Sequence, residues 1–243
     1  MPELLPAGLP APARGVFTTR AGGVSAPPYD GLDLALHVED DPAAVAANRA
    51  ALVEALDADR LAFADQVHGD AVAVVEAGGP ETAPAVDALV TAEPGTALVV
   101  LAADCLPVLL ADPVAGVVGA AHAGRQGLLA GVLQQAVRAM AALGAEPGRV
   151  EAVVGPAAGA CCYEVPAAMA DDAEARLPGT RSTTRAGTPS LDLRGGAERV
   201  LRQAGLADVR HVDHCTIDDA RFYSYRRDGR TGRHAGAVWL PRG

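Results

Sequence analysis

Aromatic residues and positive charge are both scarce in this sequence of 243 residues. Aromatic side chains make up 3% of it and hydrophobic residues 50%, so a core must consist mainly of alanine, valine and leucine. The formal net charge of −10 argues against a polyanionic partner, because phosphate backbones are bound by clustered lysine and arginine. We therefore expect a globular protein that binds no nucleic acid.

An export signal, a membrane span and a disulfide framework are likewise not expected. Glu3 and several prolines stand in residues 1–14, where a signal peptide needs a basic start and an unbroken apolar stretch. The most apolar region, residues 96–124, is interrupted by two aspartates and two prolines, whereas a bilayer span needs roughly 20 apolar residues. Two of the four cysteines are neighbours, which does not resemble a disulfide framework. We expect a cytoplasmic protein without a membrane partner.

Apolar periodicity and glycine or proline punctuation predict alternating strands and helices without a repeat or a linker, in a single domain over residues 1–243. Strands are expected at 14–20, 61–67, 71–76, 86–91, 96–103, on both sides of the DPVAG turn at 112–116, and at 149–155, 209–213, 221–226 and 235–240. Helices are expected at 42–58, 127–143, 166–176 and 195–204, and a polar loop at 177–190.

The DPVAG turn predicts a hairpin whose register can be derived from residue numbers. If residues 112–115 form a four-residue loop, Ala111 faces Gly116, and opposite residues have numbers that sum to 227. Cys105 and His122 satisfy this sum, which would place their Cβ atoms about 4.5 to 5.5 Å apart on one face of the hairpin. The register therefore predicts that a thiol and an imidazole lie next to each other.

A neighbouring thiolate and imidazole fit two kinds of chemistry, a nucleophilic cysteine with its base or part of a metal site. His68, at the end of an expected strand and just before Gly69, is the best candidate for a third ligand. Two imidazoles and one thiolate leave the fourth position of a zinc ion open, as in catalytic zinc sites. Taken singly, however, a histidine at a strand end is more often a satisfied polar residue than a ligand, and a cysteine in an apolar strand is usually part of the packing.

A series of short blocks follows in order along the chain: FTTRAGGVS at 17–25, DDPAAVAANR at 40–49, QVHG at 66–69, DALVT at 87–91, ADCLPVLLADP at 103–113, AHAG at 121–124, GPAAGACCYEV at 155–165 and RRDGRTGR at 226–233. Together these blocks resemble the YfiH family, also called the laccase-domain, polyphenol oxidase-type or multicopper-oxidase-like family. The resemblance implies an α+β fold, an α/β/β/α sandwich with mixed sheets similar to the catalytic domain of cytotoxic necrotizing factors. It also implies Zn²⁺ bound by His68, Cys105 and His122.

The resemblance further implies a purine nucleoside phosphorylase that uses phosphate to cleave adenosine, inosine and methylthioadenosine, and that also deaminates adenosine. The catalytic residues would be His68, Cys105 and His122. Substrate-binding candidates, several of them arginines suited to phosphate, are Arg20, Asn48, Arg49, Gln66, Arg125, Tyr163 and Arg227. For Asn48 and Arg49 the helix pattern alone instead favours a solvent-facing pair. We expect a monomer or a weak homo-oligomer.

The sequence departs from the family pattern at two places. Arg125 and Gln126 follow His-Ala-Gly where the family usually has Trp-Arg, and Asp33 replaces a usual asparagine. Two alternatives stay open: a cysteine-type amidase or hydrolase acting on a peptidoglycan precursor, with Cys105 as nucleophile and His122 as its base, and a non-catalytic zinc-binding protein that has lost turnover through the altered 125–126 segment. Laccase activity is not expected, because the six histidines include no His-x-His pair, although copper is able to occupy the zinc site adventitiously.

Overall fold

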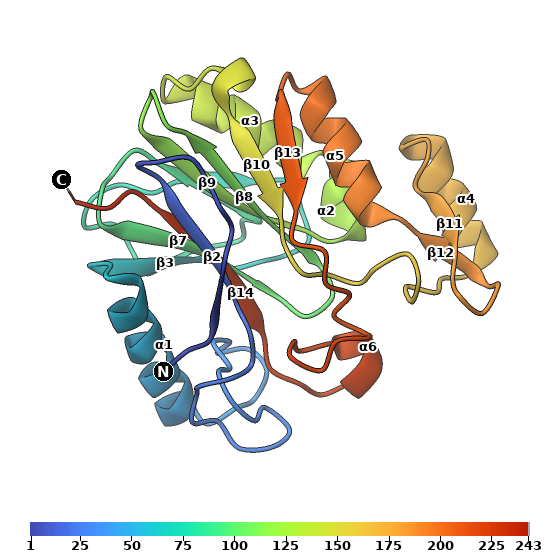
Figure 1. Ribbon diagram of the computed structural model, residues 1–243, viewed down its shortest axis with the longest axis horizontal. Coiled ribbons are helices and arrows are strands. Elements are labelled where there is room, and N and C mark those ends of the chain that lie inside the picture. Colours follow the sequence, from blue (N-terminus) through green and yellow to red (C-terminus); the bar gives the residue numbers. More distant parts are fainter. Residues whose placement is uncertain (243) are drawn as a thin grey trace.

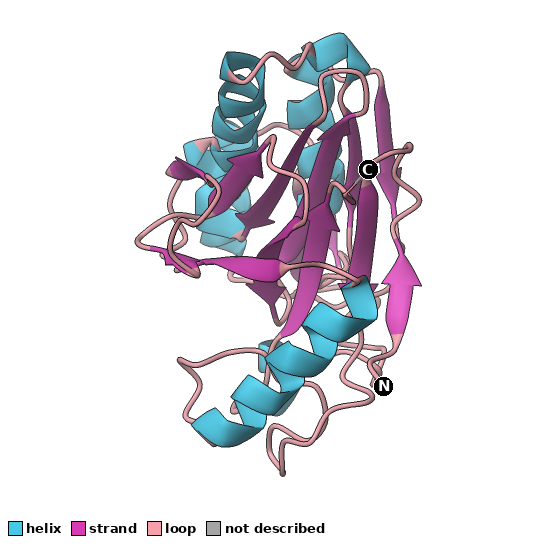
Figure 2. Ribbon diagram, turned by 90° about the vertical axis from the view of Figure 1, so that its left-hand side faces the viewer, coloured by secondary structure: helices cyan, strands magenta, loops and turns pink. Residues whose placement is uncertain are grey.

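The computed structural model describes residues 1–242 and shows two sheets packed face to face with helices on both outer sides (Figures 1 and 2). The first sheet has the order β1 (Leu4–Pro6), β2 (Arg14–Thr18), β14 (His234–Trp239), β7 (Thr96–Ala102), β3 (Arg60–Ala64) and β5 (Thr82–Ala83). The second has the order β13 (Asp208–His211), β10 (Glu151–Val154), β8 (Leu106–Asp112), β9 (Val117–Ala123), β6 (Ala88–Thr91) and β4 (Val72–Val74). Both sheets mix parallel and antiparallel pairs, so the expected sandwich with mixed sheets is confirmed.

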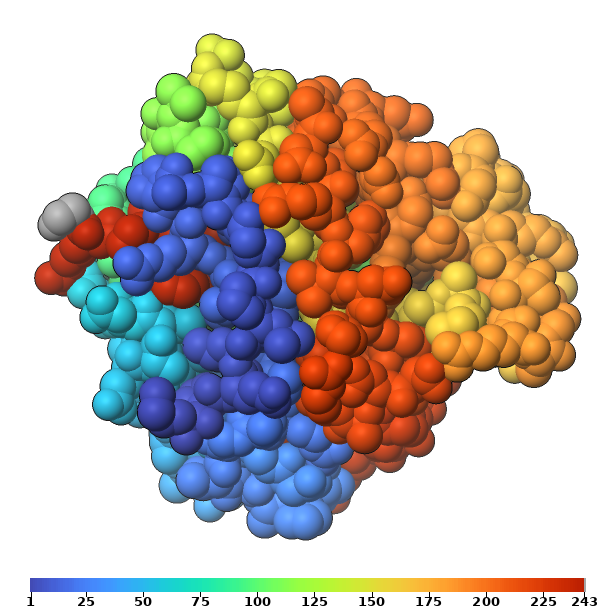
Figure 3. All heavy atoms as spheres, viewed as in Figure 1, coloured from blue at the N-terminus to red at the C-terminus, as the bar shows by residue number. Residues whose placement is uncertain are grey.

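The helices are unevenly distributed over the two outer faces. Helix α1 (Pro42–Leu56) covers the first sheet, while α2 (Arg125–Ala130), α3 (Val132–Ala142) and α5 (Leu193–Gln203) cover the second. Helix α4 (Ala167–Arg176) and the hairpin of β11 (Arg181–Thr183) and β12 (Pro189–Leu191) project from the body of the molecule (Figure 3). The remaining helices are a short 3₁₀ turn at Pro147–Arg149 and α6 (Tyr225–Asp228). No helix within residues 1–242 is both long and apolar enough to cross a membrane.

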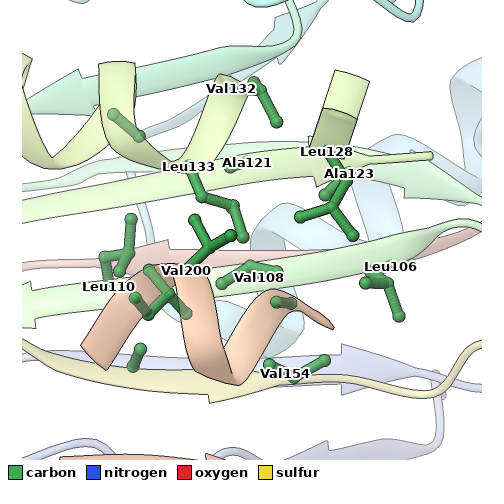
Figure 4. Close-up of a cluster of buried hydrophobic side chains, with 14 of the residues drawn as sticks. Leu106, Val108, Leu110, Ala121, Ala123, Leu128, Val132, Leu133, Val154 and Val200 are labelled. Atoms are coloured by element: carbon green, nitrogen blue, oxygen red, sulfur yellow. The ribbon is translucent and has the colours of Figure 1, made fainter. Parts of the chain in front are cut away.

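Three apolar layers hold these elements together. The layer between the sheets contains Phe17, Leu98 and Leu109, and the layer under α1 is built around residues such as Leu52. The third layer lies between the second sheet and its helices, where small and branched side chains from β8, β9 and α5 interdigitate (Figure 4). Because strands β7, β8 and β9 are buried on both faces, they appear in the sequence as continuous apolar runs without alternation.

Three expected elements differ from the structure. The helix expected at 127–143 is two helices, because Gly131 adopts φ +106° and ends α2 before α3 begins. The polar loop expected at 177–190 contains the β11–β12 hairpin. The strand expected at 221–226 is absent; instead the Ser224 side chain accepts a hydrogen bond from the Arg227 amide and caps α6.

The hairpin register also needs a correction. The loop consists of residues 113–116, one residue later than expected, so Asp112 pairs with Val117 and opposite numbers sum to 229. His122 therefore faces Pro107 rather than Cys105, which precedes β8. The difference of two residues keeps Cys105 on the same face of the hairpin, diagonal to His122. The predicted proximity survives for that reason, although the predicted pairing is wrong.

The carboxylate of Asp112 organises this hairpin turn. It is fully buried and accepts hydrogen bonds from the amides of Val114, Ala115 and Glu146 and from the Arg149 guanidinium. Although burial alone would raise the pKa of Asp112, these donors outweigh it and lower the pKa to about 2.

We expect Asp112→Asn to reduce the free energy of unfolding at neutral pH by about 2 kcal/mol. The folded-state pKa of Asp112 lies below its unfolded value, so the stabilisation is present above about pH 4 and is lost as the pH falls towards about 2. Urea denaturation of wild type and Asp112→Asn between these pH values measures the difference in their free energies of unfolding. The difference between them should shrink on acidification; a difference independent of pH would show that packing, and not charge, is responsible.

Candidate functional site

Three side chains from separate parts of the chain converge at one edge of the sheets. His122 lies in β9, Cys105 immediately precedes β8, and His68 lies in the loop after β3. One ligand atom from each lies within 4.8 Å of the others, and the Cys105 Sγ to His68 Nε2 distance is 3.9 Å. The convergence expected from the sequence is therefore present in the structure.

Asp87, just before β6, holds two of the three residues in place. Its fully buried carboxylate lies 2.8 Å from His122 Nδ1 and accepts hydrogen bonds from the backbone amides of Val67, His68 and Gly69. His68 has a φ of +61°, an uncommon backbone conformation that the three amide contacts to Asp87 hold in place. Because Nδ1 of His122 faces Asp87, its other ring nitrogen is available to the centre.

The thiol and the buried imidazole form a charged pair. Burial alone would raise the pKa of the Cys105 thiol, but the His122 and His68 imidazoles lower it to about 6. Burial would lower the pKa of His122, but Cys105 and Asp87 raise it to about 9. Both shifts favour a thiolate on Cys105 and a proton on His122 when no metal is bound.

The donor set and the space around it fit a metal ion. Two imidazole nitrogens and a thiolate are ligands preferred by zinc and copper. Gly124 contributes the space, since a Cβ atom there would come within 3.0 Å of both Cys105 Sγ and the His68 ring. The group is therefore able to hold a metal ion, and larger residues at position 124 would crowd it.

The centre opens into a cavity of about 350 Å³, a volume typical of small-molecule sites. Its walls come from the loop after β3, the end of β7 and the turn that leads from β7 into β8, and from residues near positions 163, 225 and 233. The lining residues are His37, Gln66, His68, Leu101, Ala102, Ala103, Asp104, Cys105, His122, Tyr163, Tyr225, Arg226 and Arg233.

Two of the expected substrate residues, Gln66 and Tyr163, line this cavity. The Gln66 amide donates to the carbonyl of Leu101 and accepts from its amide, both at 2.8 Å. Its side chain therefore fixes the end of β7 at the cavity wall. The Tyr163 ring lies under the Arg226 guanidinium, at 4.9 Å from ring centroid to guanidinium carbon.

Asn48 and Arg49 lie away from the cavity, but they do not face solvent. Asn48 is 1% exposed, accepts from the Val24 amide and donates to Ser25 Oγ and the Asp33 carbonyl. Arg49 donates to the Leu34 carbonyl, pairs with Glu81 and stacks on Phe63. The solvent-facing interpretation is therefore wrong, and both side chains anchor α1 to neighbouring segments.

The other three expected arginines also lie outside the cavity lining. Arg20 pairs with Asp30 at 2.6 Å, and Arg227 pairs with Asp228 and donates to backbone carbonyls of its own region. Arg125 is the first residue of α2, directly after Gly124. None of these three guanidinium groups is part of the 350 Å³ cavity wall.

Sequence reasoning missed several residues that do line the cavity. Arg226 and Arg233 belong to the RRDGRTGR block, in which Arg227 had been the candidate. Asp104, which was not among the candidates, lies before β8 with φ +94° and lines the cavity. Its two oxygens accept from Thr216 Oγ1 and the Arg226 amide, both at 2.7 Å. These hydrogen bonds make it an anchor for the cavity wall.

Residues 14–241 match the family described as "Multi-copper polyphenol oxidoreductase laccase". A Streptomyces griseus protein named purine nucleoside phosphorylase ORF3 is 54% identical over 228 residues, covering 92% of this chain and 93% of the relative. YlmD from Geobacillus stearothermophilus has a similar structure, with a TM-score of 0.91 and 33% identity over 98% of this chain and 96% of that one. YfiH from Bacillus licheniformis gives a TM-score of 0.86 at 32% identity, over 94% and 92%. The resemblance seen in the sequence is thereby confirmed.

Proposed function

The chain belongs to the multi-copper polyphenol oxidoreductase laccase family, and from this membership and its site we propose a zinc-dependent purine nucleoside phosphorylase. Its substrates would be phosphate with adenosine, inosine or methylthioadenosine, and it would act in the cytoplasm as a monomer or weak homo-oligomer. The S. griseus relative bears the name of this activity. The observation that carries the proposal is the opening of the His68, Cys105 and His122 group into a cavity that also holds two arginines.

The donor set supports zinc as the resident metal. Held by His68, Cys105 and His122, zinc would supply a Lewis acid able to polarise a substrate oxygen or activate water. Multi-copper oxidation instead needs several coppers bound by many imidazoles. Of the histidines within residues 1–242, only His68 and His122 belong to a group that is able to hold a metal, and that group would hold a single ion. Copper is therefore proposed only as an adventitious occupant.

Arg226 and Arg233 are proposed to bind phosphate. Both line the cavity, and guanidinium groups match phosphate oxygens with two parallel hydrogen bonds. The Arg226 backbone is fixed by Asp104, and the Arg233 amide donates to the buried Asp33. The chain thus places two cations beside the centre on anchored backbone.

We expect Arg226→Ala and Arg233→Ala each to raise the KM for phosphate by about ten-fold or more, because a hydrogen bond to a charged group contributes roughly 1.5 to 3 kcal/mol. Initial rates at varied phosphate and saturating adenosine measure the effect. Arg230→Ala is the matched control, since Arg230 pairs with Glu39 and Tyr29 outside the cavity. Equal KM values in all four proteins would contradict phosphate binding by these arginines.

Adenosine deamination is proposed as a second activity of the same centre, because water activated by zinc would attack C6 of the purine, with its proton passed to the departing amino group, which leaves as ammonia. One experiment tests both activities. Protein of known metal content is incubated with adenosine, with and without phosphate, and the products are separated by chromatography. Adenine that forms only with phosphate supports phosphorolysis, and inosine in either reaction supports deamination. Formation of neither product contradicts both.

The thiolate and imidazolium pair favours one alternative, a cysteine hydrolase in which Cys105 is the nucleophile. A peptidoglycan precursor would be the substrate in that case. Removal of the metal by a chelator separates the two functions. The phosphorylase should lose activity and regain it with added zinc, whereas a metal-free cysteine hydrolase should retain activity after chelation and lose it to a thiol alkylator.

A further inference from the structure

A second group of sulfur atoms lies outside the cavity described above. Cys161 and Cys162 are in the loop after β10, and Cys215 is in the loop after β13. Their three Sγ atoms lie within 4.8 Å of one another, with 2.9 Å between those of Cys161 and Cys162. All three thiols are partly exposed, so they are not simply packing in the core.

The topology explains why these cysteines meet. Strands β10 and β13 are parallel neighbours, so the loops that leave them begin at the same edge and run side by side (Figure 1). A parallel bridge joins Ala157 to Cys215, and the Thr216 amide donates to the Ala157 carbonyl at 3.1 Å. Backbone hydrogen bonds at the edge of the sheet therefore hold the two cysteine-bearing loops next to each other.

Gly159 provides space for the sulfur atoms and a hydrogen-bond donor to one of them. The Gly159 amide donates to Cys215 Sγ at 3.3 Å. A Cβ atom at Gly159 would lie 3.2 Å from the Cys161 sulfur and 3.4 Å from that of Cys215. Cys161 and Cys215 also line a cleft of about 710 Å³, which gives an ion a path from solvent.

We propose that Cys161, Cys162 and Cys215 form a second metal site, for a thiophilic cation such as zinc, independent of the site at Cys105. Three cysteines are a known zinc ligand set, with bonds of about 2.3 Å that separate tetrahedrally arranged sulfurs by about 3.8 Å. The present separations, from 2.9 Å to at most 4.8 Å, bracket that value. The cleft leaves the fourth position open to water or another ligand.

An ion at this site would stabilise the loops that form the wall of the first cavity. Tyr163 directly follows Cys162 and lines that cavity. Thr216, which follows Cys215, donates to Asp104, and the Ala158 amide donates to the Asp104 carbonyl at 2.9 Å. The sulfur site is thus placed to act as a structural clamp on residues beside the first centre, without touching its cavity.

Anaerobic titration with Co²⁺ tests the proposal, because thiolate-to-cobalt absorption reports each cysteine ligand. The starting material is fully reduced, metal-free protein with four free thiols. Wild type should bind two ions per chain. Cys105→Ser should bind one cobalt ion, at the sulfur site, and keep the absorption of three of the four thiolates. The double variant Cys161→Ser/Cys215→Ser should also bind one cobalt ion, at the first site, and keep the absorption of the Cys105 thiolate alone. No ion bound by folded Cys105→Ser, or as many ions bound by the double variant as by wild type, would overturn the second site.

A measurement on wild type alone guards against variants that fail to fold. Zinc-loaded and metal-free protein are treated with N-ethylmaleimide, and each modified cysteine is identified by mass spectrometry. If the ion is held as in structural sites, zinc should slow the labelling of all three cysteines, Cys161, Cys162 and Cys215, by roughly ten-fold or more. Equal labelling with and without zinc would contradict the proposal. So would a disulfide among the three in acid-quenched cells, because it would remove two of the ligands.

Discussion

The Cys105→Ser variant should lose phosphorolysis of adenosine by roughly 1000-fold, equivalent to about 4 kcal/mol of transition-state stabilisation, while keeping its fold. Cys105 would be the anionic ligand of the proposed metal, because its pKa is lowered to about 6, whereas a serine hydroxyl stays protonated at neutral pH. The substitution also removes the negative charge that helps to raise the pKa of His122. The kcat/KM for adenosine and the zinc content per chain, measured together, check the prediction.

Loss of activity in Cys105→Ser alone does not separate a metal ligand from a nucleophile, but His68→Ala does. His68 completes the metal group, whereas a nucleophilic pair needs only Cys105 and His122. The phosphorylase should therefore lose activity in both variants. His211→Ala is the matched control, since His211 pairs with Glu198 at the surface of α5, away from the centre. Full activity in His68→Ala would contradict metal-dependent catalysis.

The proximity of Cys105 and His122 was predictable from the sequence without the exact hairpin register. It requires only that the two side chains lie on the same face of the hairpin, and residues two positions apart in a strand share a face. A shift of the loop by one residue moved the partner of His122 from Cys105 to Pro107. Both of these positions are on the same face of the hairpin, because side chains of a strand alternate. If the residue opposite His122 had instead changed by one position, the Cys105 thiol would lie on the other face of the hairpin and the predicted proximity would be wrong.

Asp87 could not be identified in the same way, because its role depends on a contact between strands that are distant in sequence. Strand β6 pairs with β9 so that Ala88 faces Ala121, and Asp87 therefore lies opposite His122. Nothing in the local pattern of DALVT indicates which strand is its neighbour. The family resemblance marks the block as a whole, but only the sheet order shows that its aspartate contacts the imidazole.

The arginines that line the cavity differ from those expected for a local reason. Residues 221–226 had been expected to form a strand, but the chain turns into α6 with Ser224 as its cap. This turn sends the side chains of Arg226 and Arg227 in different directions, so that Arg226 lines the cavity and Arg227 contacts backbone carbonyls. A run of adjacent arginines therefore predicts a basic segment, but its caps and turns decide which guanidinium lines the cavity.

The Asp87→Asn variant should bind zinc about 10 to 100-fold more weakly, the usual cost of losing a partner that orients a ligand. Asp87 accepts four hydrogen bonds, three from amides of the His68 loop and one from His122. An asparagine amide offers only one oxygen acceptor, so its NH₂ group would face a donor. Loss of the carboxylate also removes one cause of the raised pKa of His122, so this pKa should fall in the metal-free variant. Zinc competition with a fluorescent chelator and NMR titration of His122 measure the two effects.

Asp112→Asn is the matched control for this experiment, because Asp112 is also a fully buried carboxylate that accepts backbone amides, but in the hairpin turn and away from the centre. Both variants should unfold at lower urea concentration than wild type. Only Asp87→Asn should lose zinc affinity and lower the pKa of His122, since only Asp87 contacts the imidazole. If folded Asp87→Asn bound zinc as tightly as Asp112→Asn, the Asp87 carboxylate would stabilise the backbone turn at His68 without contributing to zinc affinity.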